Sequence, residues 1–178
     1  MKRLISTTSV MLLIATLFSC AAPTAVPPTA TPTMDLVQPG EKVGDMQLTS
    51  GQHEGVKGFT DFCNPFGEPN QGAVVRKCNI PALERLHIGW GWFAPTMEEL
   101  NSDWQQITWE LYLDGQLVNL PAFGTYEIDA NIGGPQKMRV WDVVLEKPMP
   151  GEHKLHYIIA SQNPDYQTDV TWEFTISK

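Results

Sequence analysis

Apolar and polar residues alternate along several segments of this chain, and a period of two is typical of half-buried β-strands. The alternation runs through residues 43–49, 85–92, 107–113, 139–146, 153–160 and 170–176. Turn signals separate the segments: Asp114-Gly115 precedes a returning strand at 116–120, and Pro150-Gly151 precedes the strand at 153–160. The pattern therefore predicts an all-β domain.

One segment breaks the alternation. In residues 95–106, Thr96 is followed three positions later by Glu99, which is the spacing of a helix capping box. Met97, Leu100 and Trp104 fall at helical spacing and make one apolar face. We therefore expect one short helix inserted between two strands.

Parity along the strands assigns side chains to faces. Three tryptophans share the parity of aliphatic neighbours and should lie in the core: Trp109, Trp141 and Trp172. Three carboxylates take the opposite parity and should face outward: Glu110, Asp142 and Glu173.

The stretch RLHIGWGWFAPT, residues 85–96, places two tryptophans between bare glycines. Parity puts Trp90 and Trp92 on the core side and Gly89 and Gly91 on the other, beside His87. His87 is then expected to be semi-exposed or hydrogen-bonded within the sheet. The alternative is a ligand surface, for which the candidate residues are His87, Gly89, Trp90, Gly91, Trp92 and Trp104.

The strand spacing across residues 43–177, the LYLDGQLV hairpin and the PGEHKLHYII…TWEFTI ending resemble immunoglobulin-like and fibronectin-III-like modules. The resemblance implies an antiparallel immunoglobulin-like β-sandwich with one short inserted helix. Such modules serve many roles, so this resemblance implies no particular function.

The chain starts with a positive segment, Lys2 and Arg3, followed by an apolar stretch too short to be a permanent membrane helix. Its end, Leu17-Phe18-Ser19-Cys20, resembles the lipobox of bacterial lipoproteins, which implies cleavage before Cys20 and lipidation of its sulfur. The expected organisation is a signal peptide at 1–19, a lipidated cysteine with a Pro/Thr-rich linker at 20–34, and a domain at 35–178. The expected location is extracytoplasmic, at the cell membrane or cell surface.

Without Lys2 and Arg3 the mature chain carries ten basic and twenty acidic side chains. This balance argues against nucleic acid and against direct binding to anionic lipid, since both require basic patches. The partners expected are the membrane, through lipid on Cys20, and an envelope protein or polysaccharide. No cofactor and no metal are predicted.

Cys63 and Cys78 remain as an even pair in an oxidising compartment, bracketing a stretch rich in Pro, Gly and Asn. A metal site would need further ligands, and only His53 and Asp61 are close in sequence. We predict a disulfide.

Catalytic motifs are missing from the sequence: there is no G-x-S-x-G elbow, and both domain cysteines are expected to be oxidised. The leading hypothesis is a non-catalytic, lipid-anchored binding or structural module. One alternative is a carbohydrate-binding module that uses Trp90 and Trp92. A less favoured one is a small envelope hydrolase or a hydrolase inhibitor.

Overall fold

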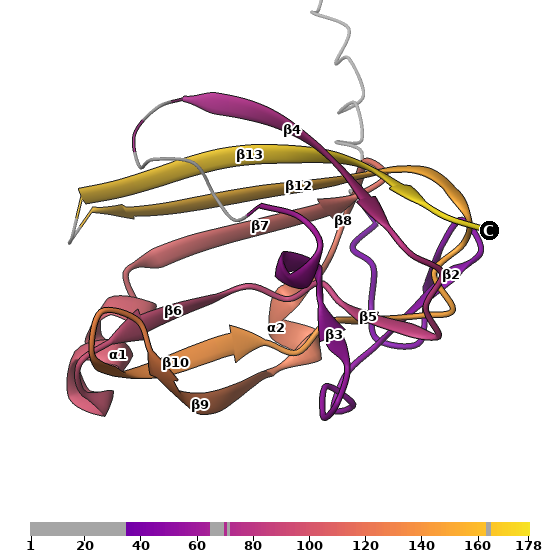
Figure 1. Cartoon of the computed structure of the whole chain (residues 1–178). Coiled ribbons are helices and arrows are strands. Elements are labelled where there is room, and N and C mark those ends of the chain that lie inside the picture. Colours follow the sequence, from indigo (N-terminus) through magenta and orange to yellow (C-terminus); the bar gives the residue numbers. More distant parts are fainter. Residues whose placement is uncertain (1–34, 65–69, 71, 163–164) are drawn as a thin grey trace, which may run out of the picture. The chain divides into compact units, whose positions relative to one another are not determined.

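The computed structural model describes residues 35–64, 70, 72–162 and 165–178, and their regular structure is mostly β (Figure 1). Cys20, the signal peptide and the linker lie outside these residues. Within them, no helix has both the length and the apolar character needed to cross a membrane.

The strands of the described residues form three sheets, numbered here for reference. Sheet 1 has the order β1 (Lys42–Val43), β2 (Met46–Thr49), β11 (Val144–Glu146), β5 (Arg85–His87), β3 (Lys57–Gly58). Sheet 2 has the order β6 (Gly91–Ala94), β10 (Pro135–Trp141), β9 (Thr125–Asn131). Sheet 3 has the order β4 (Ala73–Ile80), β13 (Asp165–Ile176), β12 (Gly151–Gln162), β7 (Ile107–Leu113), β8 (Gln116–Leu117).

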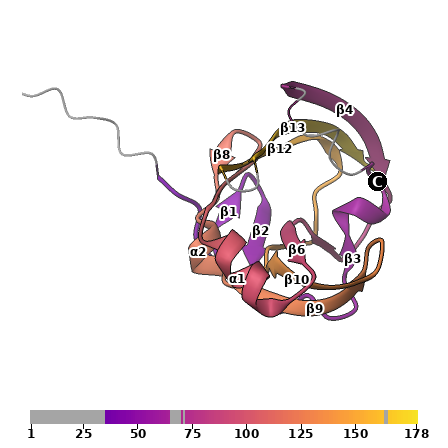
Figure 2. The same ribbon diagram turned by 90° about the vertical axis from the view of Figure 1, so that its left-hand side faces the viewer.

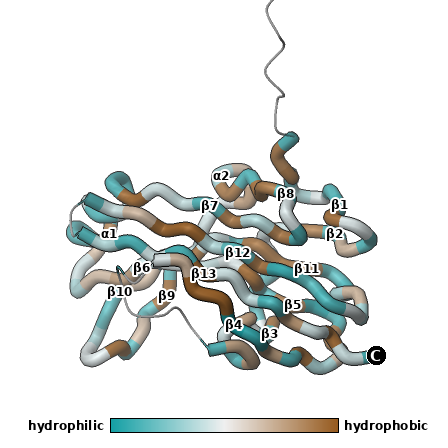
Figure 3. The backbone as a smooth tube through the Cα atoms, turned by 90° about the horizontal axis from the view of Figure 1, so that it is seen from above, coloured by the Kyte–Doolittle hydropathy of each residue, from teal (hydrophilic) through white to brown (hydrophobic). Residues whose placement is uncertain are grey.

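A single hydrophobic core joins sheet 1 and sheet 3. Met46, Leu48 and Leu145 of sheet 1 belong to the same buried cluster as Tyr157 and Trp172 of sheet 3. The predicted alternation along residues 153–160 and 170–176 is confirmed, because every second residue is buried from Leu155 to Ser161 in β12 and from Thr168 to Ile176 in β13. Figure 3 shows the same alternation as brown and teal stretches along the backbone.

The predicted all-β class is confirmed, but the wholly antiparallel arrangement is wrong. β4 pairs with β13 in parallel, and β3 pairs with β5 in parallel. Both pairings join segments that are distant in sequence, and local alternation does not indicate strand direction.

The predicted inserted helix is present as α1 (Met97–Trp104), and Thr96 caps it by accepting a hydrogen bond from the Glu99 amide at 3.2 Å. It packs against β6 and β10 of sheet 2. Two further short helices were not predicted: α2 (Leu120–Phe123) and a 3-10 helix (Phe59–Asp61). The helix α2 replaces the end of the strand expected at 116–120. Figure 2 shows sheet 2 and α1 on the opposite side from β4, β13 and β12.

The two strands expected at 85–92 and 139–146 each divide between sheet 1 and sheet 2, yet they stay paired throughout. β5 pairs with β11, and β6 pairs with β10, in one continuous register. Backbone hydrogen bonds bridge the division: Ile88 donates to Val143 at 2.9 Å, and Trp141 donates to Trp90 at 2.8 Å. The ladder therefore passes from one sheet into the other at a bend, and Gly89 lies opposite Asp142 at this bend.

Gly89 and Gly91 are required by this close pairing. A Cβ atom on Gly89 would stand 1.6 Å from the Trp141 carbonyl oxygen, and one on Gly91 would stand 2.2 Å from the Arg139 carbonyl oxygen. The partner backbone, rather than a ring, therefore fills the space beside both glycines.

The predicted disulfide between Cys63 and Cys78 is present, with the two Cα atoms 5.4 Å apart. It connects the segment after the 3-10 helix to β4. The stretch between the two cysteines ends in five residues of that strand, 73–77.

We expect Gly89→Ala to lower the free energy of unfolding by about 3 kcal/mol, because backbone must move to admit a single methyl group. Gly58→Ala is the matched control, since its Cβ would meet only Thr60 at an ordinary 3.5 Å. Urea denaturation of both variants measures the difference. Equal stabilities would contradict the close approach at the bend.

Candidate functional site

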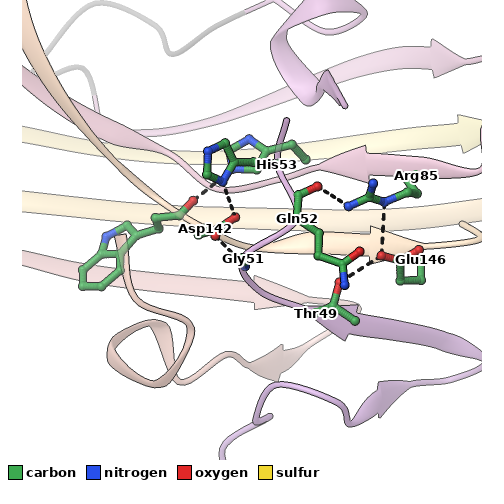
Figure 4. A network of polar contacts seen from close by, with 9 residues as sticks. Thr49, Gly51, Gln52, His53, Arg85, Asp142 and Glu146 are labelled. Atoms are coloured by element: carbon green, nitrogen blue, oxygen red, sulfur yellow. Dashed lines mark hydrogen bonds and ion pairs between the residues drawn. The ribbon is translucent and has the colours of Figure 1, made fainter. Parts of the chain in front are cut away.

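Polar side chains gather on the outer side of the bend, the side away from the core. Asp142 and His87 come from the bent ladder and Tyr126 from β9. The segment at residues 50–53, which follows β2, lies over them and contributes His53 (Figure 4). We call these four side chains the bend cluster.

Asp142 is the anchor of the bend cluster. Its residue is 5% exposed, whereas parity predicted a carboxylate facing solvent. The predicted direction of the Asp142 side chain was right, but its predicted exposure was wrong, because residues 50–53 cover that side. One oxygen accepts the Gly51 amide at 2.5 Å, and the other lies 3.2 Å from His53 Nδ1. The imidazole is not aligned for a hydrogen bond, so the two groups are in contact without one.

A second carboxylate fixes the same segment. Glu146 accepts hydrogen bonds from the Thr49 hydroxyl at 3.0 Å and from Arg85 Nε at 3.2 Å, and Arg85 also donates to the Gln52 carbonyl. Asp142 therefore holds the segment directly, and Glu146 holds it through Thr49 and Arg85 (Figure 4).

The rings of the bend cluster are packed face to edge and face to face. His53 stacks on Tyr126 with 3.5 Å between ring centroids, and His87 meets the edge of Tyr126 at 5.7 Å. His87 Nε2 lies 3.1 Å from the Trp141 carbonyl oxygen, which can only accept, so this nitrogen carries the hydrogen.

Burial changes the acid–base behaviour of two rings. The pKa of His87 is lowered because the imidazole is desolvated, although the Trp141 carbonyl and Asp142 oppose this effect. The pKa of Tyr126 is raised to about 12 by burial and by the charge on Asp142. Both rings are therefore neutral near pH 7.

An aspartate beside an imidazole is also part of general-base catalysis, which further needs a proton donor to activate. Among the described residues, no hydroxyl or thiol is hydrogen-bonded to His53 or His87. The same residues contain no group of three His, Cys, Asp or Glu placed to hold a metal ion. The contacts of the bend cluster hold the segment at residues 50–53 against the bend, which is a structural role.

Next to the bend cluster, sheet 2 leaves a line of apolar side chains uncovered. Phe93, Met138 and Ile128 lie directly opposite one another on β6, β10 and β9, so they share one face. Phe93 is 44% exposed and Ile128 is 45% exposed. Ile132, in the turn after β9, is 44% exposed. We call these four residues the outer row.

The opposite face of sheet 2 is covered by α1. Trp92 donates its indole hydrogen to Asp103 at 3.2 Å, and Arg139 donates to Asn101 at 2.6 Å. The Arg139 guanidinium also lies over the Trp104 ring.

The six residues proposed as a ligand surface do not share one face. His87, Gly89 and Gly91 lie on the outer side, where His87 is buried. Trp90, Trp92 and Trp104 are partly buried and pack against the core. Trp90 stacks on Trp172 with 5.4 Å between ring centroids. Tyr126, Ile128 and Met138 did not stand out in the sequence, because four of the seven β9 residues are polar or charged and residues 135–138 precede the expected strand.

A second candidate is a surface depression of about 780 Å³ on sheet 3. Most of its charged side chains lie beside one another: Glu173 lies 3.4 Å from both Lys77 and Lys154, and Asp114 lies 2.8 Å from His153. The two lysines lower the pKa of Glu173. Because both lysines already lie beside Glu173, the depression offers no unpaired cation that would select an anionic ligand.

No family model and no curated protein matches the chain. One solved structure, described as "Structure of PbICP-C in complex with falcipain-2", is similar over 59% of this chain and 88% of that chain. The two sequences are 16% identical and the TM-score is 0.27, which does not establish a shared fold.

The buried His87 predicts a pH dependence of stability. Its folded-state pKa is lowered from 6.5, so the unfolded chain binds more protons at mildly acidic pH. The free energy of unfolding should therefore decrease as pH falls below about 6.5. In His87→Gln, which keeps a donor for the Trp141 carbonyl, this part of the decrease should vanish. Thermal unfolding of both proteins from pH 8 to pH 5 measures this contribution, and parallel curves of stability against pH would show that His87 does not make it.

Proposed function

We propose that this protein is a non-catalytic, lipid-anchored, extracytoplasmic module that binds a partner protein through the outer row. The observation that carries this proposal is the exposure of Phe93 and Ile128 on either side of Met138 on one face of sheet 2, with the exposed Ile132 in the turn after β9. Contiguous apolar residues on the surface of a folded domain mark interaction sites, because leaving them in water is unfavourable.

The chemistry of the outer row favours a protein over a polysaccharide. Its members are phenylalanine, methionine and isoleucine, and aromatic residues and methionine are enriched in protein interfaces. Flat indoles that could stack on sugars are partly buried against the core or α1, as Trp90 and Trp92 show.

The outward face of sheet 3 is different in character. His156 lies 2.8 Å from Asp169, Tyr112 donates to Glu110 at 2.6 Å, and Val75 is the isolated exposed hydrophobic residue of β4. A polar face of this kind is typical of a solvated sheet. The outer row is therefore the better candidate for an interface.

The finer fold assignment, an immunoglobulin-like sandwich, is part of the same proposal. Two five-stranded sheets that share one core and a long final hairpin, β12–β13, support it. The parallel strand β4 would be an addition to such a module.

The anchor is supported by the sequence alone, through the lipobox at Leu17-Phe18-Ser19-Cys20. Two or three acyl chains on Cys20 would hold the domain at a membrane surface. The acidic balance of the chain agrees with attachment through lipid rather than through basic residues.

The interface can be tested by a photo-crosslinking amino acid placed at Ile128 or at Val75 of the full chain, expressed in a lipoprotein-processing bacterium with its native envelope proteins. We expect Ile128 to give an adduct with one defined protein and Val75, at 63% exposure on sheet 3, to give none. Met138→Lys should reduce the Ile128 adduct about tenfold. Equal adducts at both positions, or none at Ile128, would argue against the outer row.

The anchor can be tested by labelling cells with an alkyne-bearing fatty acid. The wild-type chain should take up the label, and Cys20→Ala should lose it completely, since the proposed acyl chains depend on this cysteine. Ser19→Ala, which leaves Cys20 in place, is the control. Label retained by Cys20→Ala would refute lipidation at this residue.

A further inference from the structure

β9 is an edge strand. Its one strand neighbour in the described part of the chain is β10, with which it pairs from Thr125 to Asn131. The other edge of a strand presents a row of backbone groups that a further strand can pair with.

The hydrogen-bond pattern tells which β9 residues point to that free edge. Asp142 donates to Gly124, and Ile132 donates to Gly134, each at 3.0 Å, at the two ends of the β9–β10 ladder. Hydrogen-bonded pairs alternate in an antiparallel ladder, so even-numbered β9 residues bond to β10. The amides pointing away from β10 are those of Thr125, Glu127, Asp129 and Asn131.

Side chains along the free edge also alternate in character. Ile128 belongs to the outer row, whereas Glu127 and Asp129 project from the other face. Arg139 pairs with Glu127, and Lys137 pairs with Asp129, both from β10. Each carboxylate therefore has a cation on one side and the free edge on the other.

Sheet 3 contains the completed form of this arrangement. There, Glu173 of β13 lies between Lys77 of β4 and Lys154 of β12, 3.4 Å from each. The three residues are directly opposite one another on adjacent strands. In sheet 2 the corresponding second cation, beyond Glu127 or Asp129, is not supplied by the described residues.

A second copy of this chain fits the edge poorly. Pairing β9 with β9 around Ile128 would place Glu127 of one copy opposite Asp129 of the other, and like charges directly opposite are destabilising. The edge is complementary to a different strand, in which apolar residues alternate with basic ones.

We propose that the partner protein adds an extended segment to β9 as a fourth, antiparallel strand of sheet 2. Its apolar residues extend the outer row next to Ile128, and its basic residues lie opposite Glu127 and Asp129. The proposal rests on the proposed function, since it names the part of the partner that occupies the outer row. Antiparallel addition matches both existing pairings of sheet 2.

The first experiment uses a terminally blocked eight-residue peptide of alternating valine and lysine, with binding to the full chain measured by fluorescence anisotropy. Asp129→Pro removes an amide that points to the free edge and leaves the β9–β10 bonds intact, so the domain should still fold. Asp129→Ala is the matched control, because it removes the same charge and keeps the amide. We expect the proline variant to bind about tenfold more weakly than the alanine variant. Equal affinities would overturn strand addition.

The second experiment does not depend on folding of a variant. Two isomers of the peptide are methylated on backbone nitrogen, one at its lysines and one at its valines. Lysines opposite Glu127 and Asp129 direct their amides to β9, so the lysine isomer should lose at least about tenfold in affinity. The valine isomer, whose methyl groups point away, should bind about as well as the parent peptide. Equal losses, or a larger loss from the valine isomer, would overturn the proposal.

The two proposals can fail separately. A specific adduct at Ile128, with no difference between the peptide isomers, would leave the outer row as an interface and exclude strand addition. Isomer-specific binding without an envelope adduct would show that the edge accepts a strand while contradicting the proposed partner protein. Dimerisation of the wild-type chain abolished by Asp129→Pro would replace the partner with a second copy.

Discussion

The carbonyl group of Trp141 fills the space in which any side chain on Gly89 would stand, 1.6 Å from its Cβ position. This contact lets one antiparallel ladder continue from β5–β11 into β6–β10 while the strands change sheets. Sheet 2 exists as a separate unit because of this bend. As a consequence of the bend, sheet 2 has one face under α1 and one face on the outside. Glycine permits such an approach of two backbones because it has no side chain.

The bend also determines which polar groups are buried. Asp142 leaves the ladder on the outer side, and a buried carboxylate is unfavourable unless it is paired or hydrogen-bonded. The Gly51 amide donates a hydrogen bond to one oxygen, and the His53 ring lies 3.2 Å from the other, so the segment at residues 50–53 lies across the bend. The cover ends where His53 stacks on Tyr126. Beyond that ring, the face of sheet 2 continues as the outer row. The bend cluster and the outer row are thus neighbouring parts of one face.

The sequence is informative wherever structure depends on neighbours along the chain. The capping box at Thr96 located α1, period two located β12 and β13, and an even pair of cysteines predicted the Cys63–Cys78 disulfide. It is silent where structure depends on distant contacts. β4 is hidden in a stretch dominated by turn-forming residues, and its parallel partner lies about 95 residues away.

The same limit applies to the candidate site. Asp142 has the parity of a solvent-facing residue, and its burial comes from Gly51, 91 positions earlier. The strand β9, with the sequence TYEIDAN, does alternate, but four of its seven residues are polar or charged, as suits an edge strand that has solvent on several sides. The local pattern of an edge strand does not show what packs or pairs with its free edge, so a single sequence does not identify such a site.

The edges of the three sheets differ in how far they resist further pairing. Edge strands β1, β3 and β8 have two residues each and β6 has four, and strands that short offer few backbone groups. β4 is longer, and its Lys77 is likewise paired on one side, with Glu173, but Val75 is its isolated exposed hydrophobic residue, so it has no adjacent apolar row. β9 has seven residues, and its two carboxylates are already neutralised on one side by Arg139 and Lys137. Charges that are half paired oppose a strand with acidic residues and favour one with basic residues. Among the described edges, β9 therefore combines length, an adjacent apolar row and a selective charge pattern, which are the features expected of an edge used for binding.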